Sequence, residues 1–299
     1  MIQKPHSLVA VTVTPFSEGC RPSLDEICRQ TETLCGTGAE VLFPCASTGE
    51  FVCMETEDKL AVLRAVSGQN RGRKALFAGA ADASLEGVLR YVEAAKRWDY
   101  DACVICPPYY YPLSQEEVFR FYAAVSDAAE GMPVYAYHVP FFTTGIETDT
   151  FRRLLELPAV AGMKDSAQNL KRIAHLCDIA RRERPGFEMY TGTDDCLLPS
   201  LVAGCHGNMT ALTASMPDAI CAIYRAFRAG DLPGAMAAQA AILPVLRLCD
   251  SLPFPLGYKV LAKVTGLKTE TFTHPRAAEV ESAIRAILGK EEEIGRAHV

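Results

Sequence analysis

The sequence predicts an α/β protein, a (β/α)8 TIM barrel followed by a C-terminal helical extension. Eight short apolar segments alternate with helical patterns at a spacing of ~25 residues, as in consecutive parallel βαβ units. The pattern becomes purely helical after residue 216, and no G-x-G-x-x-G turn follows the first apolar segment. Eight units suit a closed barrel, and the missing glycine-rich turn disfavours the alternative, a doubly wound open sheet.

The predicted strands are short runs rich in β-branched, aromatic and cysteine residues. Most are bounded by proline, glycine or polar residues, which are typical of strand ends. Pro15, for example, closes the first strand. The predicted strands cover residues 8–14, 41–44, 75–79, 102–106, 133–137, 159–163, 187–190 and 207–210.

Helix start and stop signals separate these strands. Ser23 and Ser84 are N-cap residues, and Ser114 begins a Ser-Gln-Glu-Glu capping-box pattern. Gly36 and Gly38 end the first helix. The predicted helices between the strands cover residues 24–35, 56–66, 85–98, 114–129, 149–155, 170–182 and 197–203.

The barrel is complete by residue 216, so we predict a barrel over 1–216 and a helical extension over 217–290 packed against it. Residues 291–299 are charged or irregular and are predicted to be a frayed tail. The extension is predicted to contain helices at about 217–229, 232–248, 255–264 and 276–288.

Composition excludes several classes of protein. The chain has 299 residues, of which 49% are hydrophobic and 22% charged, and its net charge of −6 argues against nucleic acid or an anionic membrane as partner. No apolar run approaches the ~20 residues of a membrane span, and the N-terminus lacks the apolar core of a signal peptide. We therefore expect a cytoplasmic protein with no membrane partner.

The twelve cysteines indicate a reduced protein. Cys45 and Cys205 lie in or beside predicted strands, where a free thiol behaves as a small hydrophobe. Cys103 and Cys106 form a C-x-x-C pattern, but residues three apart on a strand point to opposite faces. No second C-x-x-C and no H-E-x-x-H is present, so we expect neither a metal site nor a cofactor.

The ends of the predicted strands carry the reactive side chains. In a parallel barrel these ends share one face, where the active site lies. Lys164 ends the sixth strand, and in a partly apolar pocket its ammonium loses solvation, which favours the nucleophilic free amine. The other polar residues at strand ends are Ser47 and Thr48 after the second strand, Tyr110 and Tyr111 after the fourth, Tyr137 on the fifth, and Gly192, Asp194 and Asp195 after the seventh.

This set favours imine chemistry, in which the lysine condenses with a ketone and a tyrosine moves the proton. The backbone N–H groups around Thr48 and Gly49 suit a carboxylate. Each residue alone also has a structural interpretation. In that interpretation, Lys164 reaches solvent or pairs with Asp165, and the turn at 47–50 only starts a helix. Tyr137 would then pack in the barrel, Asp194 would cap a helix, and the histidines 138, 175 and 206 would be structural. Their joint occurrence at four strand ends favours an active site.

Five motifs resemble one known family. In their order and spacing they are similar to the dihydrodipicolinate synthase/N-acetylneuraminate lyase family, over about residues 8–266. The motifs are Ala-Ser-Thr-Gly-Glu at 46–50, Pro-Pro-Tyr-Tyr-Tyr-Pro at 107–112, Tyr-His-Val-Pro at 137–140, Gly-Met-Lys-Asp-Ser at 162–166 and Tyr-Thr-Gly-Thr-Asp-Asp at 190–195.

The resemblance implies a cofactor-free class I lyase and a homotetramer built as a pair of dimers. It implies that Lys164 forms a Schiff base with pyruvate or a 2-keto acid and that Tyr137 transfers protons. Ser47 and Thr48 would hold the carboxylate of the keto acid and relay protons. Tyr110 would extend across the dimer interface toward the neighbouring subunit. Further substrate-binding positions that it implies are Gly49, Ser166, Gly192, Asp194, Asp195, Met209 and Phe142.

Departures from the family pattern bear on the substrate. Phe142 stands where the synthases of lysine biosynthesis have an arginine that grips a second carboxylate, and His138 replaces the usual asparagine. Ala46 replaces the first motif glycine, the turn after Gly192 lacks the tyrosine of sialic-acid lyases, and Ala211 replaces a sugar-binding serine.

Neither named specificity fits this pattern cleanly. Phe142, together with Asp194 and Asp195 as acceptors for hydroxyl groups, favours a 2-keto-3-deoxy sugar acid or sialic-acid-like lyase, or a related dehydratase. The alternative is a dihydrodipicolinate synthase, which joins pyruvate to aspartate semialdehyde and which Phe142 disfavours. A non-catalytic 2-keto-acid sensor ranks below both.

Overall fold

The computed structural model describes residues 8–17, 19–269 and 277–289. Its strands close into a barrel in chain order, from β1 to β8, and helices alternate with them, so the predicted fold class is confirmed. The strands are β1 (Leu8–Val11), β2 (Val41–Phe43), β3 (Ala75–Gly79), β4 (Ala102–Ile105), β5 (Val134–His138), β6 (Val160–Asp165), β7 (Glu188–Thr191) and β8 (Gly207–Thr210).

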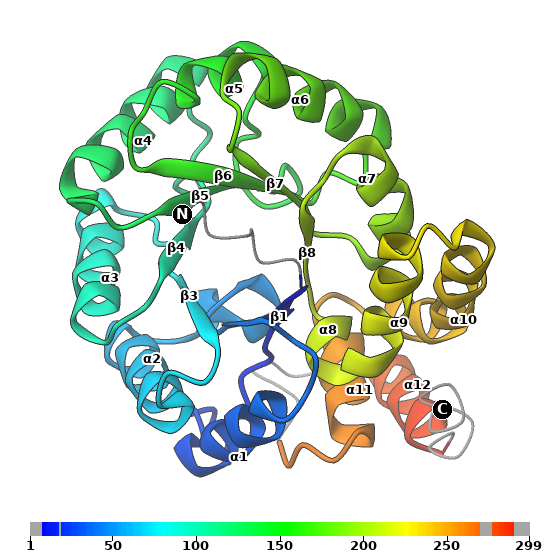
Figure 1. Ribbon diagram of the computed structural model, residues 1–299. Coiled ribbons are helices and arrows are strands. Elements are labelled where there is room, and N and C mark those ends of the chain that lie inside the picture. The colour runs from blue at the N-terminus through cyan, green and yellow to red at the C-terminus, as the bar shows by residue number, and fades with distance from the viewer. Residues whose placement is uncertain (1–7, 18, 270–276, 290–299) are drawn as a thin grey trace. The chain divides into compact units, whose positions relative to one another are not determined.

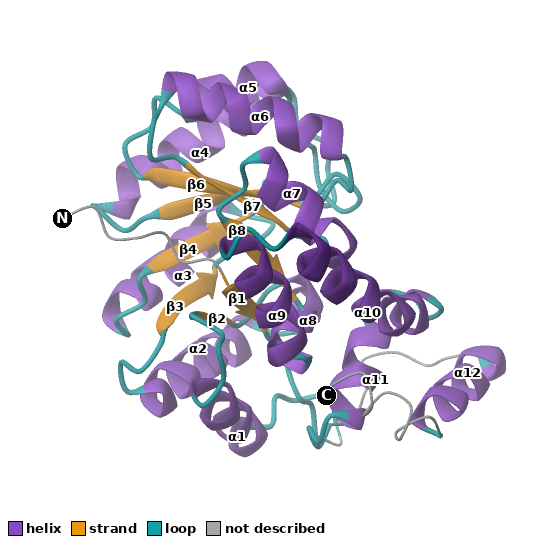
Figure 2. Ribbon diagram, turned by 45° about the vertical axis from the view of Figure 1, so that its right-hand side comes forward, coloured by secondary structure: helices purple, strands orange, loops and turns teal. Residues whose placement is uncertain are grey.

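The chain divides into two compact units, and the first consists of Met1–Val9 and Ala75–Thr210. Strands β3 to β8 of this unit pair in parallel with their neighbours, and helices α3 to α7 lie outside them (Figures 1 and 2). Strands β4 and β5 are buried along their whole length, as expected where helices cover a parallel sheet. The helices are α3 (Leu85–Arg97), α4 (Gln115–Ala129), α5 (Thr148–Leu154), α6 (Leu170–Glu183), the 3-10 helix η3 (Asp194–Cys196) and α7 (Leu197–Ala203).

The second unit consists of Ala10–Lys74 and Ala211–Val299. It contains β2, the two helices around that strand, and the C-terminal helices, of which α9 and α10 pack against each other. Its helices are α1 (Leu24–Cys35), η1 (Ser47–Gly49), η2 (Phe51–Cys53), α2 (Thr56–Asn70), α8 (Leu212–Ser215), α9 (Pro217–Arg228), α10 (Leu232–Asp250), α11 (Leu256–Val264) and α12 (Ala278–Leu288).

The predicted helix caps are mostly present. Ser114 and Glu117 form the reciprocal capping box of α4, and the Ser84 hydroxyl accepts a hydrogen bond from the Gly87 N–H. Ser23 stands at the N-cap of α1 without a side-chain hydrogen bond to the helix. The frayed tail expected at 291–299 lies outside the described residues, and the predicted domain boundary at 216 stays a prediction.

One described helix, α10, is long and apolar enough to cross a membrane by length and composition alone. No such segment was expected from the sequence, because no continuous apolar run approaches the length of a membrane span. Pro244 lies inside α10, and 33% of its most apolar window is buried. Core helices of soluble proteins pass the same test, so this helix is weak evidence for a membrane span.

Candidate active site

Lys164 and Tyr137 lie side by side on β6 and β5, where their Cα atoms are partners in the parallel register. Lys164 is only 4% exposed, and its Nζ lies 4.2 Å from the centroid of the Tyr137 ring. A cation at this distance interacts favourably with the face of the ring. The interpretation of Lys164 as a lysine that reaches solvent is therefore wrong.

The carboxylate of Asp165, next to Lys164 in the sequence, is held by other groups. It is fully buried and accepts hydrogen bonds of 2.9 Å from Arg172 Nε and from the Ala167 N–H. Arg172 also donates to the Ile146 carbonyl. A buried carboxylate needs such partners, and here an arginine of α6 supplies the charge.

His138 fastens the loop that follows β5. Its Nδ1 accepts a 2.9 Å hydrogen bond from the Ile146 N–H. Burial lowers the pKa of His138 to about 4; Asp165 opposes this shift and Arg172 adds to it. The imidazole is therefore neutral at neutral pH, as the structural interpretation of this histidine expected.

Ser166 and Gly192 lie next to the side chains of Lys164 and Tyr137. The Ser166 hydroxyl donates to Tyr137 Oη over 3.5 Å, and the Gly192 N–H donates to the Asp165 carbonyl over 2.8 Å. A Cβ on Gly192 would lie 1.9 Å from Ser166 Oγ and 2.8 Å from Lys164 Cε. Only glycine leaves room for both side chains, which explains the glycine after β7.

Tyr122 of α4 holds the backbone of Tyr137 in place through a hydrogen bond. Its hydroxyl donates to the Ile105 carbonyl over 2.7 Å and accepts from the Tyr137 N–H over 3.3 Å. The last register pair between β4 and β5 is Ile105 with Ala136. The Tyr122 hydroxyl therefore joins the two strands just beyond the point where their pairing ends. Sequence analysis missed this residue, although a tyrosine in the apolar pattern of the predicted helix 114–129 was a signal.

Tyr110 and Phe142 do not join the buried group around Lys164. They lie on the loops after β4 and β5, where Tyr110 is 86% exposed and Phe142 is 53% exposed. An isolated antiparallel bridge between Tyr109 and Thr143 joins the two loops. Tyr110 adopts a left-handed φ of 83° and packs edge-on against Tyr111.

Asp194 does not cap a helix, so that interpretation is wrong. Thr193 stands at the N-cap position of η3, and Cys196 stands at that of α7. Asp194 is buried at the start of η3, Asp195 is partly buried beside it, and Met209 is fully buried in β8.

The turn after β2 belongs to the second unit. Thr48 is buried, and a Cβ on Gly49 would lie 3.0 Å from the Thr12 carbonyl oxygen, so the turn is tightly packed. The Gly49 N–H donates to the Ala46 carbonyl over 2.9 Å. The expected carboxylate nest therefore cannot use the Gly49 N–H, and the hydroxyls of Ser47 and Thr48 remain as donors.

All twelve cysteines lie among the described residues as free thiols. Burial raises the pKa of Cys45, Cys103 and Cys106 to about 12, so these thiols stay protonated at neutral pH. Within the described ranges, no group of three or more histidine, cysteine, aspartate or glutamate side chains could hold a metal ion.

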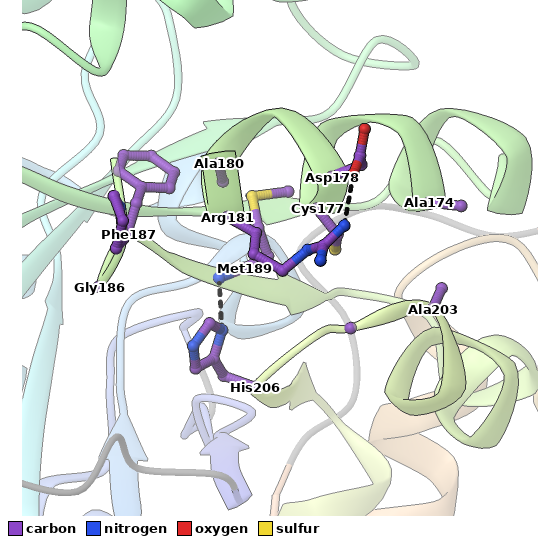
Figure 3. Close-up of a pocket in the computed structure, with 12 residues that line it drawn as sticks. Ala174, Cys177, Asp178, Ala180, Arg181, Gly186, Phe187, Met189, Ala203 and His206 are labelled. Carbon is purple, nitrogen blue, oxygen red and sulfur yellow. Dashed lines mark hydrogen bonds and ion pairs between the residues drawn. The ribbon is translucent and has the colours of Figure 1, made fainter. Parts of the chain in front are cut away.

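A cavity of ≈ 440 Å³ lies beside the amino ends of β7 and β8, next to α6 (Figure 3). Arg181 at its edge pairs with Asp178 over 2.6 Å, and His206 Nδ1 accepts a hydrogen bond from the Met189 N–H over 3.1 Å. None of the predicted site residues lines this cavity. Active sites of such barrels lie at the carboxyl ends of the strands, so this cavity is separate from the candidate site.

Comparison with known proteins identifies the family. A model of the dihydrodipicolinate synthetase family matches residues 4–290. The chain belongs to the dihydrodipicolinate synthetase family. Members of this family are lyases that act through a lysine Schiff base on pyruvate, so the predicted enzyme class is confirmed.

Individual members of the dihydrodipicolinate synthetase family are similar over most of their length. A 4-hydroxy-tetrahydrodipicolinate synthase of Anaeromyxobacter dehalogenans is 32% identical over 243 residues, or 81% of either chain. Two solved structures share the fold with a TM-score of 0.89. A catalytic-lysine mutant of the Ruminococcus gnavus sialic acid aldolase is 18% identical, covering 100% of this chain and 99% of its own. YagE of Escherichia coli K12, in complex with pyruvate, is 20% identical, covering 97% and 98%.

Proposed function

We propose that this lyase cleaves or dehydrates a 2-keto-3-deoxy sugar acid, or a similar hydroxylated 2-keto acid, through an imine on Lys164. The observation that carries the proposal is the buried amine of Lys164, 4.2 Å from the ring of its register partner Tyr137. Burial removes water from the amine, and a nucleophile adjacent to a proton-transfer group is the arrangement that covalent catalysis needs.

In the proposed cleavage, the free amine of Lys164 attacks the keto carbon and water leaves, which gives the imine. The phenol oxygen of Tyr137 accepts the proton of the substrate hydroxyl two carbons further along, while the phenol's own proton passes to the proposed relay of Ser47 and Thr48, which returns it to the enamine carbon. The carbon–carbon bond breaks, an aldehyde departs, and its electron pair passes to the imine as an enamine. Protonation and hydrolysis then release pyruvate. Ser166, which donates to Tyr137 Oη, would keep that oxygen oriented.

Ser47 and Thr48 would bind the carboxylate of the keto acid through their hydroxyls. This role is proposed from the turn that follows β2 and from the shared face of strand ends in a parallel barrel. Gly49 would provide space rather than a donor, because its N–H is bonded to Ala46.

The preference for a hydroxylated substrate rests on the missing second carboxylate clamp. Phe142 cannot make the bidentate contact of an arginine, and Arg172 is already bound to Asp165 and to a backbone carbonyl. Asp194 and Asp195 supply oxygens that accept hydrogen bonds from hydroxyl groups. Gly192 and Met209 would complete the wall of the pocket.

The second candidate is condensation of pyruvate with aspartate semialdehyde. The similarity to a 4-hydroxy-tetrahydrodipicolinate synthase favours it, and Phe142 opposes it. A non-catalytic 2-keto-acid sensor is the third, and the presence of Lys164, Tyr137, Ser47 and Thr48 argues against it.

We also infer a cytoplasmic homotetramer built from two dimers. The exposed Tyr110, on a loop bridged to the loop of Phe142, supports a contact between subunits at this surface. Aromatic side chains with a polar end are enriched in such interfaces.

Borohydride trapping tests the imine. Incubation with pyruvate and borohydride should add one reduced pyruvyl group to Lys164, detected by peptide mass spectrometry. Lys164→Ala, the control, should remain unlabelled while keeping its circular dichroism spectrum. Folded wild-type protein that stays unlabelled at saturating pyruvate would contradict the proposal.

Turnover decides the substrate. We expect the best 2-keto-3-deoxy acid to exceed aspartate semialdehyde in kcat/KM by ~10²-fold or more, because a lost charge-assisted contact costs a few kcal/mol. Pyruvate release is read with lactate dehydrogenase, and the semialdehyde reaction needs a condensation assay. A semialdehyde kcat/KM near ~10⁴ M⁻¹s⁻¹ or above would instead assign the synthase reaction.

A further inference from the structure

A second buried lysine, Lys259 of α11, lies in the unit that carries the Ser47–Gly49 turn. Lys259 is 1% exposed, and its ammonium forms an ion pair with the carboxylate of Glu50, which is itself buried. The Lys259 Nζ also lies 4.1 Å from the centroid of the Phe16 ring. The proposed chemistry uses neither member of this ion pair.

A buried ion pair contributes little net free energy to the stability of a fold. Removing an ammonium and a carboxylate from water carries a large desolvation penalty, which their mutual attraction repays only with good geometry. The same burial lowers the pKa of Lys259, and Glu50 opposes that shift. Apolar side chains would fill this space at lower cost, so the pair indicates a need for a fixed position.

Glu50 is the residue whose position matters for the turn. It adopts a left-handed backbone with φ 55° and ψ 39°, which is uncommon outside glycine. Its N–H donates to the Ser47 carbonyl over 3.1 Å, and its carbonyl accepts from the Cys53 N–H over 2.8 Å. Glu50 thus ends η1 and starts η2, and fixing its side chain fixes both backbone contacts.

We propose that Lys259 is a positioning residue for the candidate active site. By holding the Glu50 carboxylate, it keeps the Ser47–Gly49 turn in the conformation that presents the Ser47 and Thr48 hydroxyls to the carboxylate of the keto acid. This inference rests on the proposed function. It gives helix α11 an indirect part in substrate binding, through Glu50 and the turn, although α11 contributes no side chain to the imine chemistry.

The first test compares two lysines of α11. Lys259→Met removes the buried ammonium, and Lys263→Met removes an exposed one from the next turn of the helix. Lys259→Met should raise the pyruvate concentration for half-maximal borohydride trapping by ~10-fold or more, because small misplacements of binding groups are costly. Maximal labelling of Lys164 at saturating pyruvate should persist. Lys263→Met should match wild type in both.

A double variant separates positioning from stability. Lys259→Met alone removes the ion-pair partner of a buried carboxylate and should lower Tm by roughly 5 °C or more. Glu50→Gln combined with Lys259→Met removes both charges and should recover most of that loss. The pyruvate concentration for its half-maximal trapping should nevertheless stay raised, because the ion pair no longer holds the turn. Recovery of both quantities together would show that the pair is only structural and would overturn the inference.

Amide hydrogen exchange tests the same idea without chemistry. Lys259→Met should speed exchange in the peptide covering 46–53 while leaving the peptide covering 134–138 unchanged, and Lys263→Met should change neither. Unchanged exchange at 46–53 would refute the positioning role. If wild type shows no trapping but the exchange result holds, the proposed function fails and the clamp on the turn stands.

Discussion

Lys164 and Lys259 are two buried lysines in similar surroundings, and we propose a catalytic role for only one of them. Their Nζ atoms lie 4.2 and 4.1 Å from the centroid of an aromatic ring, and both side chains are at most 4% exposed. The difference is in the carboxylates. Lys259 is paired with Glu50, whereas the carboxylate next to Lys164 in the sequence, that of Asp165, is bound by Arg172.

This contrast shows that burial beside a ring does not by itself make a lysine a nucleophile. A bound carboxylate favours the ammonium, which cannot attack a carbonyl. The carboxylate adjacent to Lys164 in the sequence, that of Asp165, forms its ion pair with Arg172. Four changes break or sharpen this comparison, three through their effect on catalysis and one through its effect on acid stability.

The largest effect should come from replacing the reactive lysine itself. Lys164→Met should lower turnover by ~10⁴-fold or more, because no other group forms the imine. Its Tm should stay within about 3 °C of wild type, since an apolar side chain of similar length is usually tolerated where a charge was buried. A loss of Tm as large as that of Lys259→Met would mean that the two lysines are alike and structural.

Tyr137→Phe keeps the ring beneath Lys164 and removes only the phenol oxygen. We expect turnover to fall by ~10²-fold or more while borohydride trapping of pyruvate persists, because the lost group transfers protons. Single-turnover kinetics measure the slowed step. Normal turnover would exclude Tyr137 as the proton-transfer group and leave water or Ser47 as the candidate.

Gly192→Ala tests the packing around the reactive lysine. The added methyl would meet Ser166 Oγ and Lys164 Cε, so both must move. We expect the trapping rate to fall by ~10-fold or more, because the amine is misplaced. Gly186→Ala, at an open position in the same unit, is the control for the loss of a glycine, and it should lower Tm without slowing trapping. Equal trapping rates in the two variants would show that the fit at Gly192 is unimportant.

The last expected effect is on acid stability rather than on catalysis. The folded pKa of His138 is about 4, below the ordinary 6.5, so between these values the unfolded chain binds a proton that the folded chain does not. Stability should therefore fall as the pH drops from 6.5 to 4, by about 3 kcal/mol at most from this group. Asp165 and Arg172 face the imidazole and set the balance. His138→Asn should flatten the pH dependence of Tm, whereas His175→Asn, at an exposed position of α6, should not.

Sequence patterns predicted the barrel well because its elements carry local signals. The eight strands are short apolar runs, and the capping serines marked α3 and α4. The helix predicted to stop at residue 66 continues to Asn70, because Gly68 is tolerated inside it and the left-handed Arg71 ends it. Helix α8 was not predicted, since four residues are too few for a helical period to show.

The candidate site was predictable where a residue follows a strand and obscure where it acts from a helix. Lys164, Tyr137, Ser166 and Gly192 stand at strand ends, and the structure brings them together. Tyr122 and Lys259 lie within helical patterns, where a tyrosine or a lysine usually packs or faces solvent. Their roles depend on long-range contacts that no periodicity encodes. Phe142 was placed correctly on its loop, but its exposure was not foreseeable.

The phenol of Tyr122 allows the position of Tyr137 and the conformation of the loop after β5 to be fixed independently. It fixes the Tyr137 N–H from α4, while the loop beyond is held at its far end through Ile146 by His138 and Arg172. Residues between these two anchors, Phe142 among them, can be exchanged without moving the tyrosine. Mutations in this loop can therefore change which substrates are accepted while Tyr137, the proposed proton-transfer group, stays in place. One barrel can in this way give rise to enzymes that share a reaction and differ in substrate.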